Sequence, residues 1–183
     1  GTVPNYVGNL MNLKQMLLSD NLFTGSLPDS IINLTDLIAL SMHTNQLTGY
    51  IPESAGNLRN LGVIYMQNNN LQGSISESMS ELTRLHGLYL GSNKFTGSLS
   101  ALENLRNLQV VSLRQNHFTG TLPESFGNLK DLLTLDVSDN RLAGTLSNSI
   151  SLNMTNLKTL VVGSNRFMEG VEATNKGLLK VLA

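Results

Sequence analysis

Residues 34–47 read LTDLIALSMHTNQL, and this stretch decides the fold. Leu40, Ser41 and Met42 alternate with a period of two, which predicts a short β-strand with Leu40 and Met42 facing inward and Ser41 facing outward. Asn45 follows at the corner where the chain leaves the strand. Its amide carries both donors and an acceptor, so we expect it to satisfy backbone groups of its own coil and of the next coil.

The same frame recurs along the chain. Apolar residues stand 11, 8, 5 and 3 positions before an asparagine and 2 and 6 positions after it. The asparagines of the frame are Asn21, Asn45, Asn69, Asn93, Asn116, Asn140 and Asn165, at steps of 24, 24, 24, 23, 24 and 25 residues. One such repeat cannot bury its own apolar face, so the repeats are expected to stack and their asparagines to form a ladder.

The second half of each unit has a distinctive pattern, seen in residues 21–28 (NLFTGSLP) and 116–123 (NHFTGTLP). The whole unit matches the leucine-rich repeat signature, and its second half resembles the plant-specific class found in receptor-like kinases, receptor-like proteins and polygalacturonase-inhibiting proteins. The resemblance covers essentially all of the chain. It implies an α/β solenoid, a right-handed superhelix with a parallel concave β-sheet and short 3₁₀ or extended convex segments.

The repeats divide the chain into a single leucine-rich repeat domain. A partial repeat covers residues 1–8, seven repeats cover about 9–175, and a partial repeat covers 176–183. Because both end repeats are incomplete, we expect the chain to be a fragment of a longer protein. One repeat is a residue short near Ser100 to Leu105 and another is a residue long near Ser147 to Met154, so we expect the stack to bulge or bend at these joints.

Composition excludes several classes of partner. The 183 residues carry 12 basic and 13 acidic side chains, so no net field attracts nucleic acid or an anionic membrane. Cysteine is absent, which excludes disulfides and thiolate metal sites. No apolar run approaches the roughly 18 residues of a membrane span, so no membrane contact is expected in this segment. The resemblance implies an extracellular or membrane-anchored ectodomain whose anchor lies outside it.

The search for catalytic residues finds none. His43, His86 and His117 lie in different repeats and lack the spacing of metal ligands on one helix face. There is no nucleophile elbow and no phosphate-binding glycine loop. Asp136 and Asp139 share the predicted concave face without a pocket that excludes water. We therefore expect no enzyme activity, no metal and no cofactor.

Outward-facing residues of the predicted sheet are the candidates for binding. Tyr65 and Tyr89 fall one repeat apart in one column, so their side chains should stand about 5 Å apart. An exposed aromatic pair with a nearby arginine is typical of a binding hot spot, although neighbouring tyrosines also pack simply as cross-strand pairs. Arg114 and Asp136 are expected to form a diagonal surface ion pair. The candidate ligand-binding residues are Tyr65, Tyr89, His43, Gln67, Arg114 and Asp136.

Two sequons, Asn33-Leu34-Thr35 and Asn153-Met154-Thr155, begin where the chain enters the next coil. We expect Asn33 and Asn153 to lie at the outer edge and to be open to N-glycosylation if the chain is secreted; chance sequons are frequent in an Asn-rich chain.

The resemblance implies recognition of a protein or peptide by the concave and lateral surface of an extracellular receptor, receptor-like protein or glycoprotein. Alternatives are an inhibitor of secreted cell-wall hydrolases and a structural subunit that acts as a scaffold in a larger assembly. Ice binding is a further alternative, because a hydroxyl column recurs beside the glycines. That column contains Thr24, Thr48, Thr96 and Thr119, and a second such column contains Ser26, Ser74, Ser98, Thr121 and Thr145. Tyr50, Gln72, Ala143 and Met168 interrupt the two columns.

Overall fold

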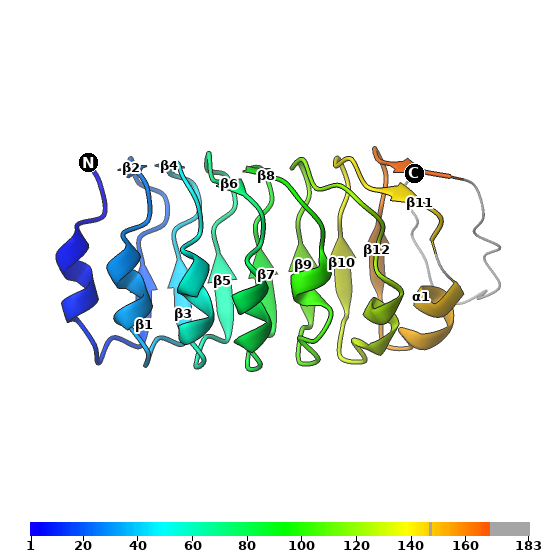
Figure 1. Ribbon diagram of the computed structural model, residues 1–183, viewed down its shortest axis with the longest axis horizontal. Coiled ribbons are helices and arrows are strands. Elements are labelled where there is room, and N and C mark those ends of the chain that lie inside the picture. Colours follow the sequence, from blue (N-terminus) through cyan, green and yellow to red (C-terminus); the bar gives the residue numbers. More distant parts are fainter. Residues whose placement is uncertain (147, 169–183) are drawn as a thin grey trace.

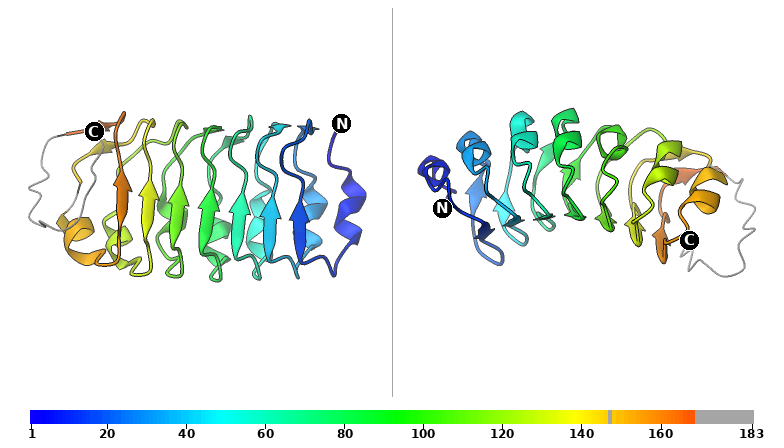
Figure 2. Two further views of the ribbon diagram at one scale, coloured as in Figure 1. Left: turned by 180° about the vertical axis from the view of Figure 1, so that it is seen from behind. Right: turned by 90° about the horizontal axis from the view of Figure 1, so that it is seen from below.

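The computed structural model describes residues 1–146 and 148–168, which form one elongated solenoid (Figure 1). Each coil contributes one strand to a seven-stranded parallel sheet in the order β1-β3-β5-β7-β9-β10-β12. These strands are β1 (Gln15–Leu17), β3 (Ala39–Ser41), β5 (Val63–Tyr65), β7 (Gly87–Tyr89), β9 (Val110–Ser112), β10 (Thr134–Asp136) and β12 (Thr159–Val161). Figure 2 shows this sheet from behind and, in the view from below, on the inner side of a gentle arc.

Shorter strands follow six of the seven corners, at one edge of the solenoid. They pair as β2 with β4, β6 with β8, and β11 with β13. Their bounds are β2 (Thr24–Gly25), β4 (Gln46–Leu47), β6 (Gln72–Gly73), β8 (Lys94–Phe95), β11 (Ala143–Gly144) and β13 (Arg166–Phe167). Thr24 and Gly25 of the first Thr-Gly stretch form β2, whereas β4 and β8 end directly before the next such stretches.

Short helices cover the convex side. They are the 3₁₀ helices η1 (Asn5–Asn9), η2 (Asp29–Asn33), η3 (Glu53–Asn57), η4 (Glu77–Glu81), η5 (Ser100–Leu102) and η6 (Glu124–Asn128), and the α-helix α1 (Asn148–Asn153). Pro28, Pro52 and Pro123 directly precede η2, η3 and η6. Proline fits the residue before a helix because its φ is fixed and it has no N–H to leave unpaired. The α/β solenoid with a parallel concave sheet and short convex helices is confirmed. No helix of the described residues has the length and apolar character needed to cross a membrane.

The core consists of the apolar residues of the repeat frame. In the second coil Leu34, Leu37, Leu40 and Met42 are each at most 2% exposed. In the middle of the stack, the rings of Phe95 and Phe118 lie 6.2 Å apart at 8°. Each coil thus buries its apolar side chains against the neighbouring coils, which is how solenoids are stabilised.

The expected bulge at the short and long repeats is wrong for the main sheet. Gly87 pairs with Val110 and Thr134 with Thr159, so the register continues through both joints. The missing residue shortens η5 to three residues, and the extra residue accompanies the six-residue helix α1. The convex segment absorbs the change because no ladder of backbone hydrogen bonds joins its described residues from coil to coil.

The ladder asparagines bond backward along the stack. Asn93 Nδ2 donates to Met66 O and Leu90 O at 2.9 and 3.1 Å, and Asn93 Oδ1 accepts from Leu71 N at 2.9 Å. The bonds between coils therefore reach the preceding coil and not the next one, which corrects the expected direction. Asn69, Asn93, Asn116 and Asn140 are all buried.

Every ladder asparagine is preceded by a residue with a left-handed backbone. The φ values lie between 52° and 59° although none of these residues is glycine. They are Asp20, Thr44, Asn68, Ser92, Gln115, Asp139 and Ser164. This conformation costs about 1–2 kcal/mol for most residue types. It is retained because it turns the chain off the strand while the amides, such as Asn68 N to Gly91 O at 2.9 Å, still bond across coils.

Candidate functional site

The strands β5 and β7 place Tyr65 directly beside Tyr89 in the parallel register. Their rings stack with centroids 4.7 Å apart at 23°. The imidazole of His43 meets Tyr65 edge-on, with centroids 6.4 Å apart at 80°. All three side chains are half-buried. The geometry gives a preorganised aromatic surface, because the tyrosines restrict each other's rotamers before any ligand arrives.

A pocket of about 300 Å³ opens next to Tyr89 on the concave face. Four of the six candidate residues, Gln67, Tyr89, Arg114 and Asp136, line it together with Asn68, Gly91, Ser92 and Ser112. Gly91 explains why there is space: a Cβ there would lie 3.1 Å from Arg114 Cγ and 3.3 Å from Arg114 O. His43 and Tyr65 do not line the pocket but extend the aromatic surface beside it. We call these six residues the concave patch.

The concave patch contains polar groups without protein partners. Gln67 Oε1 is buried and has no hydrogen-bond partner within the described chain. Arg114 is exposed, and the described residues offer its guanidinium no hydrogen bond or ion pair. The expected ion pair between Arg114 and Asp136 does not form. Asp136 Oδ1 instead accepts from Ser138 N at 3.1 Å and Ser138 Oγ at 2.6 Å, because that donor pair is only two residues away.

The tyrosines and the histidine differ in their electrostatic surroundings. Burial, and secondarily the neighbouring Tyr65, raises the pKa of Tyr89 above its ordinary value of 10.0. The Tyr89 phenol therefore stays neutral at physiological pH and retains its O–H donor. His43 Nδ1 lies 3.8 Å from Asp20 Oδ2 and 3.1 Å from Thr44 Oγ1.

Other predicted sites lie on different surfaces. Asn33 and Asn153 end η2 and α1 on the convex side, and both are exposed. Within residues 1–146 and 148–168 no cluster of three histidine, aspartate or glutamate side chains could hold a metal ion.

The repeat frame read from the sequence missed a second set of asparagines that join the coils. Their Nδ2 atoms donate to backbone carbonyls of the preceding coils: Asn60 to Thr35 O, Asn107 to Thr83 O and Asn156 to Lys130 O. The signal was present in the sequence as an asparagine nine positions before Asn69, Asn116 and Asn165.

Comparison with known proteins agrees with this architecture. The Leucine Rich Repeat family model matches residues 12–34 and 107–129. The chain is 34% identical to the ectodomain of the receptor kinase SOBIR1 from Arabidopsis thaliana, over 69% of this chain and 70% of that one, with a TM-score of 0.67. No curated protein sequence matches the chain.

Longer receptors match over more of the chain. The ectodomain of GASSHO1/SCHENGEN3 from Arabidopsis thaliana, solved with CASPARIAN STRIP INTEGRITY FACTOR 2, is 34% identical over 91% of this chain and 20% of that one, with a TM-score of 0.88. A plant ice-binding protein is 28% identical over 91% of this chain and 54% of that one, with a TM-score of 0.85. Other matches are plant receptors solved with peptide hormones.

The chain spans between 20% and 31% of the length of the first two receptor ectodomains. The repeat frame, the parallel sheet and the identity to SOBIR1 agree: the chain belongs to the leucine-rich repeat family and resembles plant receptor ectodomains.

Proposed function

We propose that the chain recognises a protein or peptide ligand through the concave patch, as part of an extracellular or membrane-anchored ectodomain. The observation that carries this proposal is the stacked pair Tyr65–Tyr89 beside a pocket with a free guanidinium and an unpartnered acceptor. Buried aromatic and arginine side chains contribute most of the binding energy in protein interfaces. The peptide-bound receptors of the same fold support this function.

The concave patch favours a ligand with one apolar and one polar end. A side chain lying on the tyrosine rings is desolvated by them, while a donor satisfies Gln67 Oε1 and an acceptor meets Arg114. A leucine-rich repeat ectodomain is typically a binding module and not an enzyme, and the open pocket fits that role because it does not exclude water.

Selection from a displayed peptide library tests this function. Peptides enriched on the wild-type chain are added back, and amide hydrogen exchange is measured with and without each peptide. We expect slower exchange in β5, β7 and β9 and no change in η3 and η4. Protection confined to the convex helices would overturn the assignment to the concave patch.

Ice binding is the second candidate, supported by the likeness to a plant ice-binding protein. The hydroxyl column is exposed at Thr48, Thr96 and Thr119, but Gln72 breaks it, and Tyr50 stands 62% exposed in the adjacent column. Microscopy of ice crystals grown with the purified chain decides the matter. Faceted crystals support this candidate, and round crystals reject it.

A further inference from the structure

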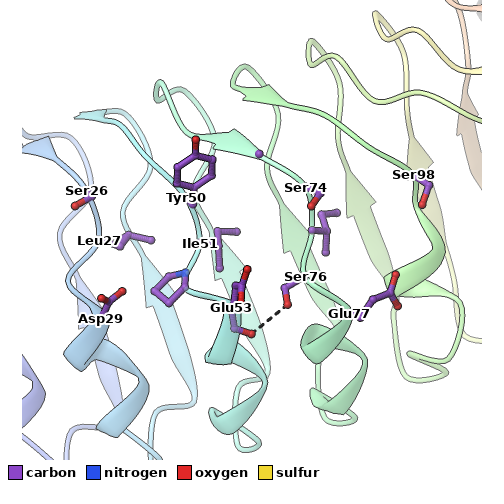
Figure 3. Close-up of a pocket in the computed structure, with 13 residues that line it drawn as sticks. Ser26, Leu27, Asp29, Tyr50, Ile51, Glu53, Ser74, Ser76, Glu77 and Ser98 are labelled. Atoms are coloured by element: carbon purple, nitrogen blue, oxygen red, sulfur yellow. Dashed lines mark hydrogen bonds between the residues drawn. The ribbon is translucent and has the colours of Figure 1, made fainter.

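A second and larger cavity lies on the flank away from the concave sheet (Figure 3). It has a volume of about 900 Å³ and runs across four coils, between the small strands and the start of η2, η3 and η4. Its floor consists of Leu27, Ile51 and Ile75, from three successive coils, which are 4%, 7% and 4% exposed. We call this cavity the flank groove. It is open and has a continuous aliphatic floor.

Tyr50 forms an aromatic wall at the upper end of the flank groove (Figure 3). The other coils around the groove carry serines in this column, at Ser26, Ser74 and Ser98. The ring of Tyr50 lies on Gly73, where an added Cβ would come within 2.4 Å of Tyr50 Cδ1. Glycine is therefore required at position 73 for two reasons. Its backbone φ is 85°, and any side chain would occupy the space of the Tyr50 ring. The ring is held in place yet remains 62% exposed.

The rim of the flank groove is acidic. Asp29, Glu53 and Glu77 begin successive helices and are all exposed. The carboxylates of Asp29 and Glu53 have no hydrogen bond or ion pair with any described residue, and Glu77 Oε1 accepts only from Ser100 Oγ at 3.0 Å. No lysine, arginine or histidine lines the groove. An occupant therefore meets a one-sided negative field above an aliphatic floor.

We propose that the flank groove docks an extended, lysine- or arginine-rich segment of a partner protein, at a surface separate from the concave patch. An extended chain points alternate side chains to one face, so basic residues at every second position would follow the row of carboxylates. Lysine and arginine stems pack on aliphatic surface while their charged ends stay near water, which matches the floor and the rim. The exposed face of Tyr50 attracts a cation as well.

A dye-labelled peptide of alternating lysine and valine, with a matched peptide of alternating glutamate and valine, tests the flank groove by fluorescence anisotropy. We expect the lysine peptide to bind and the glutamate peptide not to bind. The double variant Glu53→Gln/Glu77→Gln should weaken lysine-peptide binding about fivefold or more, and Tyr50→Ser, which restores the residue of the other coils, about threefold or more.

Matched controls separate this surface from the rest of the molecule. Asp131→Asn removes one exposed carboxylate outside the flank groove, and Tyr65→Ala alters only the concave patch; both should leave lysine-peptide affinity unchanged. The charge reversal Glu53→Lys/Glu77→Lys should shift binding to the glutamate peptide. Equal binding of both peptides to the wild-type chain, or unchanged affinity in Glu53→Gln/Glu77→Gln, overturns the proposal and leaves the concave patch untouched.

Discussion

At the scale of single residues, stability depends on the asparagines that join one coil to the preceding one. Asn93 is buried, and its amide satisfies one N–H and two C=O groups of the backbone at 3.1 Å or less. No aliphatic side chain replaces these bonds, and a buried polar group left unpaired costs about 1–3 kcal/mol. The asparagine is thus a structural residue, although it is polar and lies beside the concave face.

Replacing this residue gives a direct test of the ladder. Asn93→Ala should lower the free energy of unfolding by about 2 kcal/mol, because Leu71 N loses its partner, whereas Met66 O and Leu90 O still accept from Asn69 Nδ2 and Asn116 Nδ2. Asn21→Ala is the matched control: the Asn21 side chain is exposed and, among the described residues, donates only to Leu18 O and Ser19 O of its own coil. Its loss should be below about 1 kcal/mol. Urea unfolding followed by circular dichroism measures both, and equal losses would contradict this role.

The raised pKa of Tyr89 predicts an alkaline effect on stability. The folded state holds the phenol proton more tightly than the unfolded chain, so this contribution is complete below pH 10.0 and is lost as the pH rises through the raised pKa. In Tyr65→Phe the pKa of Tyr89 should fall but stay above 10.0, because burial is the larger cause. Nuclear magnetic resonance of labelled tyrosine follows this titration. A Tyr89 that ionises at or below its ordinary pKa would refute the packing described.

At the scale of elements, strands and convex segments differ in how strictly the sequence fixes them. The strand register was predictable because Leu88 and Leu90 must both face the core. A shift of the strand by one residue would turn both side chains to the solvent. The shape of the convex segments was not predictable, since η5 and α1 satisfy the same apolar frame with different lengths. Repeat spacing therefore predicts the sheet and leaves the helices open.

This difference predicts that two single-residue insertions change the free energy of unfolding by very different amounts. One glycine inserted after Ala101, in the short segment η5, restores the common repeat length and should change the free energy of unfolding by less than about 1 kcal/mol. One glycine inserted between Val111 and Ser112 in β9 moves Leu113 out of the core and should cost about 4 kcal/mol or abolish folding. Thermal unfolding of the two variants compares them, and similar melting temperatures would contradict this account.

At the scale of the whole molecule, one stack carries the concave patch and the flank groove as separate surfaces. The sequence predicted more of the concave patch than of the flank groove. The column of Tyr65 and Tyr89 was predictable because repeat spacing alone aligns them. The pocket beside them was not, because it depends on the path of the Arg114 side chain over Gly91. Tyr50 appeared only as an interruption of a hydroxyl column, and its role as a wall of the flank groove depends on contact with Gly73. A repeat pattern in the sequence does not show which side chains of neighbouring coils contact each other.

The affinity of a library-selected peptide for the wild-type chain and two variants tests the central claim most directly. If the ligand lies on the concave patch, Tyr89→Ala should raise the Kd roughly thirtyfold, the effect of losing a hot-spot side chain worth about 2 kcal/mol. Tyr6→Ala, which removes a tyrosine that is 73% exposed on η1, should leave the Kd unchanged. Equal Kd values for the wild-type chain and Tyr89→Ala would contradict recognition through the concave patch.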